Sequence, residues 1–273
     1  MPLPVRDMSA RPPSLALLAL EGRAIAELGA FFQALPLLHS SPRGDGHPIL
    51  VLPGFSASDV STAPLRAFLR RQGYAAVGWG QGRNRGPRPG VELGMVRRLE
   101  HLYWSTGRQV SVVGWSLGGI YARELARQRP EMTRLVVTLG SPFASARSTN
   151  VDRLFEAVSG MSIDDLDAEL VRRMREPPPV PSTAIYSTSD GIAHWEACVD
   201  AREDAQTENV RVPGSHCGLG HNPLAVYVIA DRLGQKEGRW RRFERAGWRS
   251  LIFPPPAARN GHSKPTATRL RPA

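Results

Sequence analysis

Short apolar runs recur along the middle of the chain, and most are followed by a stretch with helical spacing. The runs cover residues 48–52, 74–79, 109–113, 134–139, 183–187 and 210–212. Apolar positions three and four residues apart mark the stretches 62–72, 91–106, 117–128 and 223–233. Continuous apolar runs are typical of strands buried on both faces of a parallel sheet. Their alternation with helices predicts an α/β fold with a mostly parallel sheet and helices on both faces.

One segment interrupts this alternation between the fourth and fifth runs. Residues 145–181 carry helical stretches, an acidic cluster within 164–169 and a proline run at 177–181. An insertion at this place lies over the carboxyl edge of the sheet, where the sites of open α/β sheets form. We expect a lid-like cover that shapes the site, with an ordinary packed helix pair as the equally favoured alternative.

The flanking segments predict additions to one α/β domain. Residues 1–13 hold four prolines and predict a loose arm, and residues 14–38 predict a helix. Its expected packing face consists of Leu15, Leu18, Ile25, Leu28 and Phe32. In the basic tail we expect packing through Trp240, Phe243 and Trp248, and disorder over the last fifteen residues. The predicted division is an arm and helix over 1–46, an α/β domain over 47–235 and a tail over 236–273.

The strongest chemical signal is the sequence Gly-Trp-Ser-Leu-Gly-Gly at 114–119, between a predicted strand and a predicted helix. A G-x-S-x-G sequence in this context is typical of a nucleophile elbow. The turn is so tight that side chains at Gly114 and Gly118 would clash. It raises Ser116 at the start of a helix and directs the Leu117 amide toward developing negative charge. We therefore predict Ser116 as a nucleophile, in preference to a simple glycine-rich turn.

A serine hydroxyl needs a histidine to take its proton and a carboxylate to orient that histidine. In proteins with this elbow the chain order is serine, acid, histidine. Asp190 follows the run 183–187 after a short turn, as the acid requires. The competing carboxylates lie on predicted helices or away from a strand end; they are Asp164, Asp165, Asp167, Asp200 and Asp204.

Two histidines follow the last predicted strand. His216 comes first, among glycine and other small residues that let a loop turn back over Ser116. His221 precedes Asn222-Pro223 and is suited to cap the closing helix. We therefore favour His216 as the catalytic base.

Two further loops bear on the site. The loop after the run 48–52 predicts the amide of Phe55 as the second donor to the oxyanion, with Gly54 allowing close approach of the backbone. The glycine-rich stretch 78–86 matches neither common phosphate-binding pattern. We interpret it as a loop of the substrate channel rather than a nucleotide site.

From about residue 47 to residue 233 the chain resembles the α/β-hydrolase superfamily, and within it small bacterial triacylglycerol lipases and esterases. Residues 114–119 are similar to the lipase elbow, 138–142 to a segment after a family strand, 186–190 to the acid loop and 209–219 to the histidine loop. The resemblance implies the α/β-hydrolase fold, an ester substrate and His216 as base. The family commonly has His-Gly in the first oxyanion loop, whereas this chain has Pro53-Gly54. The orienting role of that histidine is therefore absent here.

Charge changes this picture little. The formal net charge is +10, and nearly all positive charge is arginine, since lysine occurs only at Lys236 and Lys264. Arginine is spread along the chain and is more frequent in the tail, which indicates solvated surface positions. A nucleic-acid site needs a clustered basic face, so this spread disfavours nucleic acid as a partner. The charge is compatible with contact to an anionic membrane surface or with acidic substrates.

The cysteines and the apolar runs bear on where in the cell the protein is located. Cys198 and Cys217 make no disulfide framework, and whether they pair stays open. No apolar run approaches the length of a membrane span. The stretch 15–20 is short and lacks a convincing cleavage site after it, so we expect a cytoplasmic protein.

These observations predict an esterase or lipase-like serine hydrolase that acts through Ser116, Asp190 and His216 and an acyl-enzyme. The expected substrate is a small-molecule or lipid ester, and no metal or cofactor is expected. One alternative is an acyltransferase, because the same elbow serves an alcohol acceptor. The other is a non-catalytic basic protein that binds membrane or nucleic acid.

Overall fold

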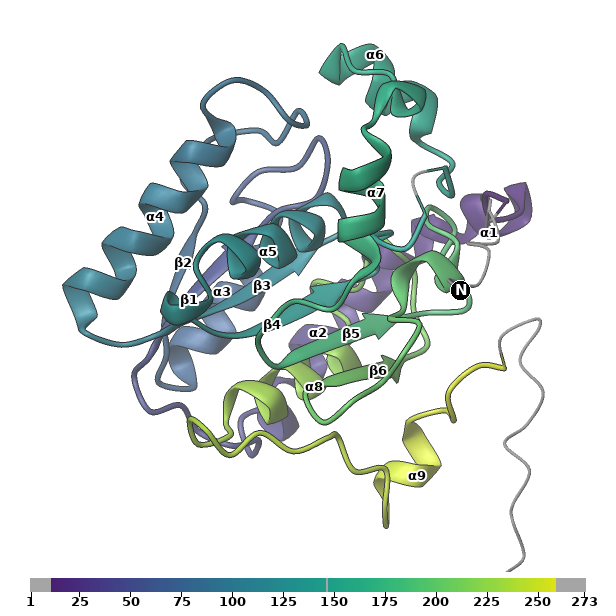
Figure 1. Cartoon of the computed structure of the whole chain (residues 1–273). Coiled ribbons are helices and arrows are strands. Elements are labelled where there is room, and N and C mark those ends of the chain that lie inside the picture. The colour runs from purple at the N-terminus through teal and green to yellow at the C-terminus, as the bar shows by residue number, and fades with distance from the viewer. Residues whose placement is uncertain (1–10, 146, 259–273) are drawn as a thin grey trace, which may run out of the picture.

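The computed structural model describes residues 11–145 and 147–258 of the 273-residue chain. Its centre is a sheet of six parallel strands in the order β2-β1-β3-β4-β5-β6 (Figure 1). The strands are β1 (Pro48–Leu52), β2 (Ala75–Gly78), β3 (Val110–Trp115), β4 (Thr133–Leu139), β5 (Ser182–Tyr186) and β6 (Thr207–Arg211). Every predicted run forms a strand, although β6 begins ahead of the predicted run 210–212. The α/β fold with a parallel sheet is confirmed.

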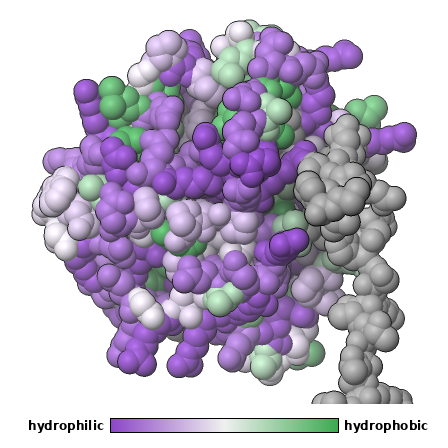
Figure 2. Space-filling model, viewed as in Figure 1, coloured by the Kyte–Doolittle hydropathy of each residue, from purple (hydrophilic) through white to green (hydrophobic). Residues whose placement is uncertain are grey.

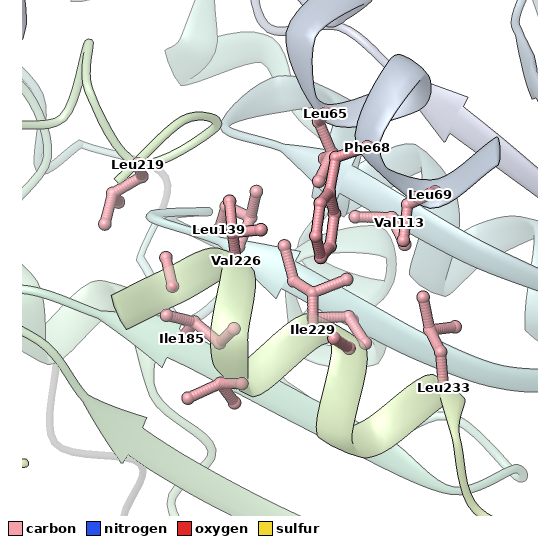
Figure 3. Packing of buried hydrophobic residues seen from close by; sticks show 14 of the residues in the cluster. Leu65, Phe68, Leu69, Val113, Leu139, Ile185, Leu219, Val226, Ile229 and Leu233 are labelled. Atoms are coloured by element: carbon pink, nitrogen blue, oxygen red, sulfur yellow. The ribbon is translucent and has the colours of Figure 1, made fainter. Parts of the chain in front are cut away.

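Helices cover both faces of this sheet. One face carries α2 (Ala24–Leu38), α3 (Ala63–Arg71) and α8 (Pro223–Leu233), and the other carries α4 (Val91–Thr106) and α5 (Leu117–Gln128). Along β1, Ile49 and Val51 join the first core, whereas Leu50 and Leu52 join the second. Figure 3 shows the first core, where side chains of α3 and α8 meet those of the strands. Because both faces are buried, the strands need no polar positions, which explains the continuous apolar runs.

The N-terminal strap is our name for residues 15–38, which comprise α1 (Leu15–Ala19), the 3₁₀ turn η1 (Leu20–Arg23) and α2. The strap is helical as predicted and packs against α8. The predicted packing face is right at Leu28, which packs against the core, but wrong at Ile25 (81% exposed) and Phe32 (55% exposed); Phe31 and Leu38 are buried instead. The 3₁₀ turn changes the helical phase. A spacing counted across it from Leu15 therefore does not describe one face.

The insertion between β4 and β5 contains α6 (Asp152–Ser159), η3 (Ile163–Asp165) and α7 (Ala168–Arg175). The chain then returns to β5 past Glu176, whose carbonyl oxygen accepts a hydrogen bond of 2.7 Å from Arg123 of α5. The Arg123 guanidinium is buried and also pairs with Asp200 at 2.7 Å. A buried charge is stable only when it is paired in this way. The hydrogen bond from Arg123 to Glu176 thus ties the base of the insertion to α5, and Asp200 balances the buried charge of Arg123.

Part of the C-terminal segment packs on the domain. Phe243 is buried as predicted, together with Phe253, which lies beyond the short helix α9 (Arg249–Ile252). Trp240 is partly buried, but Trp248 is 54% exposed and makes an edge contact with the ring of Tyr227. Packing through Trp248 as a buried residue was therefore wrong.

Some expectations concern other properties of the chain. Of the segments predicted as a loose arm (1–13) and a disordered end (the last fifteen residues), residues 1–10 and 259–273 lie outside the described residues. Cys198 and Cys217 are both free thiols. Within the ranges 11–145 and 147–258, no helix has the length and apolar character needed to span a membrane.

Candidate active site

The turn at Ser116 joins β3 to α5 in a strained conformation. Ser116 has φ 53° and ψ −122°, a backbone conformation that residues other than glycine rarely adopt. A side chain on Gly114 would overlap the Gly118 carbonyl, and one on Gly118 would lie 2.5 Å from the Leu52 carbonyl oxygen. The Ser116 amide donates a hydrogen bond of 2.8 Å to Leu139 of β4. The two glycines and this bond hold the serine at the carboxyl edge of the sheet.

Asp190 and His216 meet at the same edge. Asp190 follows β5 and His216 follows β6, and the Asp190 Oδ2 atom lies 2.7 Å from His216 Nδ1. Both side chains are buried. The other carboxylate oxygen, Oδ1, accepts hydrogen bonds from the amides of Ile192 (2.8 Å) and Ala193 (2.7 Å). These bonds leave Oδ2 directed at the imidazole.

Two close contacts place the Asp190–His216 pair beside the elbow. Gly140 follows Leu139 with φ 54°, and a Cβ there would lie 3.1 Å from both Asp190 Oδ2 and His216 Nδ1. The indole nitrogen of Trp115, the residue before Ser116, donates a hydrogen bond of 3.0 Å to the His216 carbonyl. The structure thus brings Ser116, Asp190 and His216 to one end of the sheet.

The competing side chains lie elsewhere. His221 Nε2 is 3.0 Å from the Ala24 carbonyl oxygen of the strap, and its ring meets Trp115 edge-on. The cap of α8 is instead Asn222, which accepts from the amides of Leu224 and Ala225. Capping of that helix by His221 is therefore wrong. Asp164 forms a surface ion pair with Arg147, and Asp200 pairs with Arg123.

Burial and nearby negative charges have opposite effects on the pKa of His216. Burial by itself lowers the pKa of His216, because it penalises the imidazolium. The charge of Asp190, its hydrogen bond and the charge of Glu21 raise that pKa more than burial lowers it. The site therefore stabilises a proton on His216, as general base catalysis requires.

The loop after β1 lies against the nucleophile. A Cβ on Gly54 would lie 3.2 Å from the Ser116 Cβ atom, a tight contact that glycine avoids. Among the described residues, the Phe55 amide has no hydrogen-bond acceptor. Leu117 is the first residue of α5, where amides have no acceptor within the helix. Both predicted oxyanion donors are therefore free to bind a ligand.

Asn84 holds this loop and was not among the predicted site residues. Its side-chain amide, which is fully buried, donates a hydrogen bond of 2.9 Å to the Pro53 carbonyl. Its backbone pairs with the loop twice, accepting from Ser56 (2.6 Å) and donating to Ala57 (2.7 Å). Asn84 thus orients the loop in which a histidine is replaced by Pro53. No local pattern marks it, because its partners lie about 30 residues earlier in the chain.

A cavity of about 380 Å³ opens beside Ser116. The domain contributes apolar lining residues that include Phe55, Met95, Leu117, Ile120 and Tyr121. The insertion contributes Phe155, Met161, Ile163, Leu166, Leu170 and Met174. The rings of Phe55 and Phe155 are in edge contact, with centroids 5.3 Å apart. Figure 2 shows hydrophobic residues at the top of the molecule, where α6 and α7 lie. The insertion therefore forms part of the wall of this cavity.

No group of three or more histidine, cysteine or carboxylate side chains that could hold a metal ion occurs in the part of the chain that the structure describes.

A serine in a strained turn between a strand and a helix, at the carboxyl edge of a parallel sheet, is the architecture of α/β hydrolases. The sequence profile of the Alpha/beta hydrolase family matches residues 49–267, and the chain belongs to this family. Membership supports a hydrolase activity. No curated protein sequence matches the chain.

Solved structures similar to this one include two lipases. Lipase B of Aspergillus fumigatus has 16% sequence identity and a TM-score of 0.56, over 70% of this chain and 53% of that chain. The mature form of Bacillus licheniformis lipase BlEst2 has 14% identity and a TM-score of 0.52, over 71% and 94% of the two chains. This chain spans about half the length of the Aspergillus enzyme. At these identities the likeness shows the fold alone.

Proposed function

We propose that this protein is a serine hydrolase that cleaves carboxylic esters with an apolar acyl group. Ser116 is the nucleophile, His216 the general base and Asp190 the residue that orients His216. The observation that carries the proposal is the Asp190–His216 pair, 2.7 Å apart, at the sheet edge that holds the strained Ser116. A fold of this kind hosts many reactions, so the site rather than the fold supports the function.

In the first half of the reaction, the Ser116 hydroxyl oxygen attacks the ester carbonyl carbon while His216 takes the hydroxyl proton. The amides of Phe55 and Leu117 stabilise the negative charge on the carbonyl oxygen. Asp190 stabilises the imidazolium that forms. When the tetrahedral intermediate collapses, the alcohol leaves with the proton from His216. The acyl group stays on Ser116.

In the second half, water attacks the acyl-enzyme and gives its proton to His216. The new tetrahedral intermediate collapses, the carboxylic acid leaves, and the proton returns from His216 to Ser116. An alcohol in place of water would make the protein an acyltransferase, by the same steps.

The cavity supports an apolar acyl group. Its lining is mostly aliphatic and aromatic, and burial of each methylene group of a ligand contributes about 0.8 kcal/mol. Five charged residues also border the cavity: Arg88, Glu92, Glu124, Asp152 and Arg173. We propose a small-molecule or lipid ester whose acyl chain lies between α5 and the insertion.

The electrostatics give an expected pH dependence. His216 must be neutral to accept a proton, so activity falls as the pH drops through its pKa. Because Asp190 and Glu21 raise that pKa against the effect of burial, we expect the acid limb of kcat/KM above 6.5, the ordinary histidine value. Measurement of kcat/KM from about pH 4 to about pH 9 locates this acid limb. A limb below that value would contradict the assignment of His216 as base.

Fluorophosphonate labelling tests the proposal directly. The probe should modify Ser116, identified by mass spectrometry of the labelled peptide, and prior labelling should abolish hydrolysis of p-nitrophenyl esters. A series of rising acyl length should show higher kcat/KM for apolar chains than for acetate. Transfer to an added alcohol in preference to water would identify the acyltransferase. Absence of labelling in a folded sample would exclude both activities.

A further inference from the structure

Glu21 of the strap lies where the acid loop and the histidine loop meet. We define the acid loop as residues 187–193 and the histidine loop as residues 212–220. The Glu21 side chain is buried, and its Oε1 atom accepts hydrogen bonds from the amides of Gly191 (2.7 Å) and His216 (2.9 Å). Its Oε2 atom accepts from the Cys217 amide (2.8 Å). One carboxylate therefore joins the residue after Asp190 to His216 itself.

Neighbouring residues of the strap strengthen this junction. Arg23 donates to the carbonyl oxygens of Ser189 (2.5 Å) and Gly214 (2.9 Å), one in each loop. Glu27 accepts from the Ser215 amide at 2.8 Å. Hydrogen bonds with one charged partner are shorter and stronger than neutral ones. The strap therefore clamps both loops, but of its side chains Glu21 alone bonds to the backbone of His216 in the described structure.

Glu21 is an anion in this setting. Burial raises its pKa, but the three backbone donors and the positive charge of His216 lower it more, so the pKa lies below its ordinary value. The ionisable groups that face His216 are Asp190 from the acid loop, Glu21 from the strap and Cys217 beside it. Arg23 and Glu27 lie further along the strap and pair with each other at 3.4 Å. His216 is thus bonded to two carboxylates, to Asp190 through its ring and to Glu21 through its backbone amide.

We propose that Glu21 is a positioning residue of the active site, which ties the acid and histidine loops together and places a second negative charge beside His216. The inference rests on the proposed role of His216 as base. A purely structural role would anchor the strap and nothing more. The two roles differ in what they do to the proton on His216, and this difference can be measured.

The test compares Glu21→Gln, Glu21→Asp and Glu27→Gln in the full chain. Glutamine removes the charge and leaves a single oxygen to accept from three backbone donors, so the second charge is lost and the tie between the loops is weakened. We expect kcat/KM to fall about tenfold to a hundredfold, the range for small misplacements of a catalytic group. The acid limb should move to lower pH, because the charge that raises the pKa of His216 is gone. Glu27→Gln removes a carboxylate of the same strap and should leave the limb in place.

Two further measurements keep the outcome decisive. Titration of the His216 ring protons by NMR reports its pKa in the resting protein, with His216→Ala assigning the signal. This readout needs no substrate, so it tests Glu21 even if the wild type hydrolyses no ester. Glu21→Asp keeps the charge on a shorter arm, so the rate should fall while the limb stays near that of the wild type. If Glu21→Gln does not fold, the rate and pH profile of Glu21→Asp test the proposal in its place.

If the pKa of His216 measured by NMR is the same in Glu21→Gln as in the wild type, the proposal is wrong and Glu21 only anchors the strap. Wild-type rates in Glu21→Asp and Glu21→Gln would overturn it as well.

Discussion

The proposed nucleophile and its two proposed partners are held in place by different means. The turn at Ser116 is made within a few residues of chain, because the glycines on either side permit it, and the neighbouring strands β1 and β4 then hold it in the interior of the sheet. Asp190 and His216 stand on loops after β5 and β6, toward the edge of the sheet. Those loops are held by side chains of the strap, which lies more than 160 residues away along the chain. A local constraint leaves a sequence motif, and a long-range one does not.

Ser116→Ala is expected to have the largest effect. Removal of the attacking oxygen should lower kcat by roughly 10⁶, with a residual rate from the oxyanion amides and binding. The fold should survive, since the two glycines and not the hydroxyl set the turn. Ester hydrolysis and the melting temperature check the two halves of this statement. Ser105→Ala on the exposed face of α4 is the control. Retention of more than a few per cent of wild-type activity in Ser116→Ala would assign the nucleophile elsewhere.

His216→Ala should be as severe as Ser116→Ala, because a nucleophile and its base act as a unit. His221→Ala should be milder. It removes a hydrogen bond to the strap and a contact with Trp115, at a cost of about 1 kcal/mol in the free energy of unfolding. Rates and urea midpoints of the two variants separate catalysis from support. An inactive His221 variant beside an active His216 variant would reverse the assignment.

Asn84→Ala tests whether the oxyanion loop depends on distant support, as the acid and histidine loops do. The Pro53 carbonyl would lose its buried donor, which destabilises the fold by about 1–3 kcal/mol. We expect kcat to fall by about tenfold, less than the loss of an oxyanion donor itself. Arg85→Ala, at an exposed neighbour, should change neither quantity. Equal kcat values for Asn84→Ala and the wild type would show that the loop holds its own conformation.

The smallest effect is expected in the insertion. Phe155→Ala and Leu166→Ala enlarge the cavity, so the ratio of kcat/KM between long and short acyl esters should shift by about tenfold. Leu154→Ala is the matched control, because Leu154 is 53% exposed and does not line the cavity. A lowered melting temperature with unchanged chain-length preference would mean that the insertion is an ordinary packed helix pair.

The sequence by itself determined the sheet, most of the helices and the elbow. The bounds of β1, α4, α5 and α8 are those of the predicted runs, because apolar runs and the glycines and prolines beside them act over a few residues. The turn at Ser116 could be predicted because the G-x-S-x-G pattern lies within five residues, and the steric exclusion at Gly114 comes from Gly118 and Gly119 beside it. The catalytic roles of Asp190 and His216 remain predictions, drawn from chain order.

Tertiary structure decided the packing face of the strap, the place of the insertion over the cavity, and the roles of Glu21 and Asn84. The helical spacing placed Phe32 inward, but contact with Phe68 buries Phe31 instead. In the sequence Glu21 resembles an ordinary polar residue of a surface helix. In the structure it accepts hydrogen bonds from backbone amides of two loops. Buried backbone amides must find acceptors, and in irregular loops these acceptors come from whatever segment packs there. No pattern of neighbouring residues records that choice, because it is made between parts of the chain far apart in sequence.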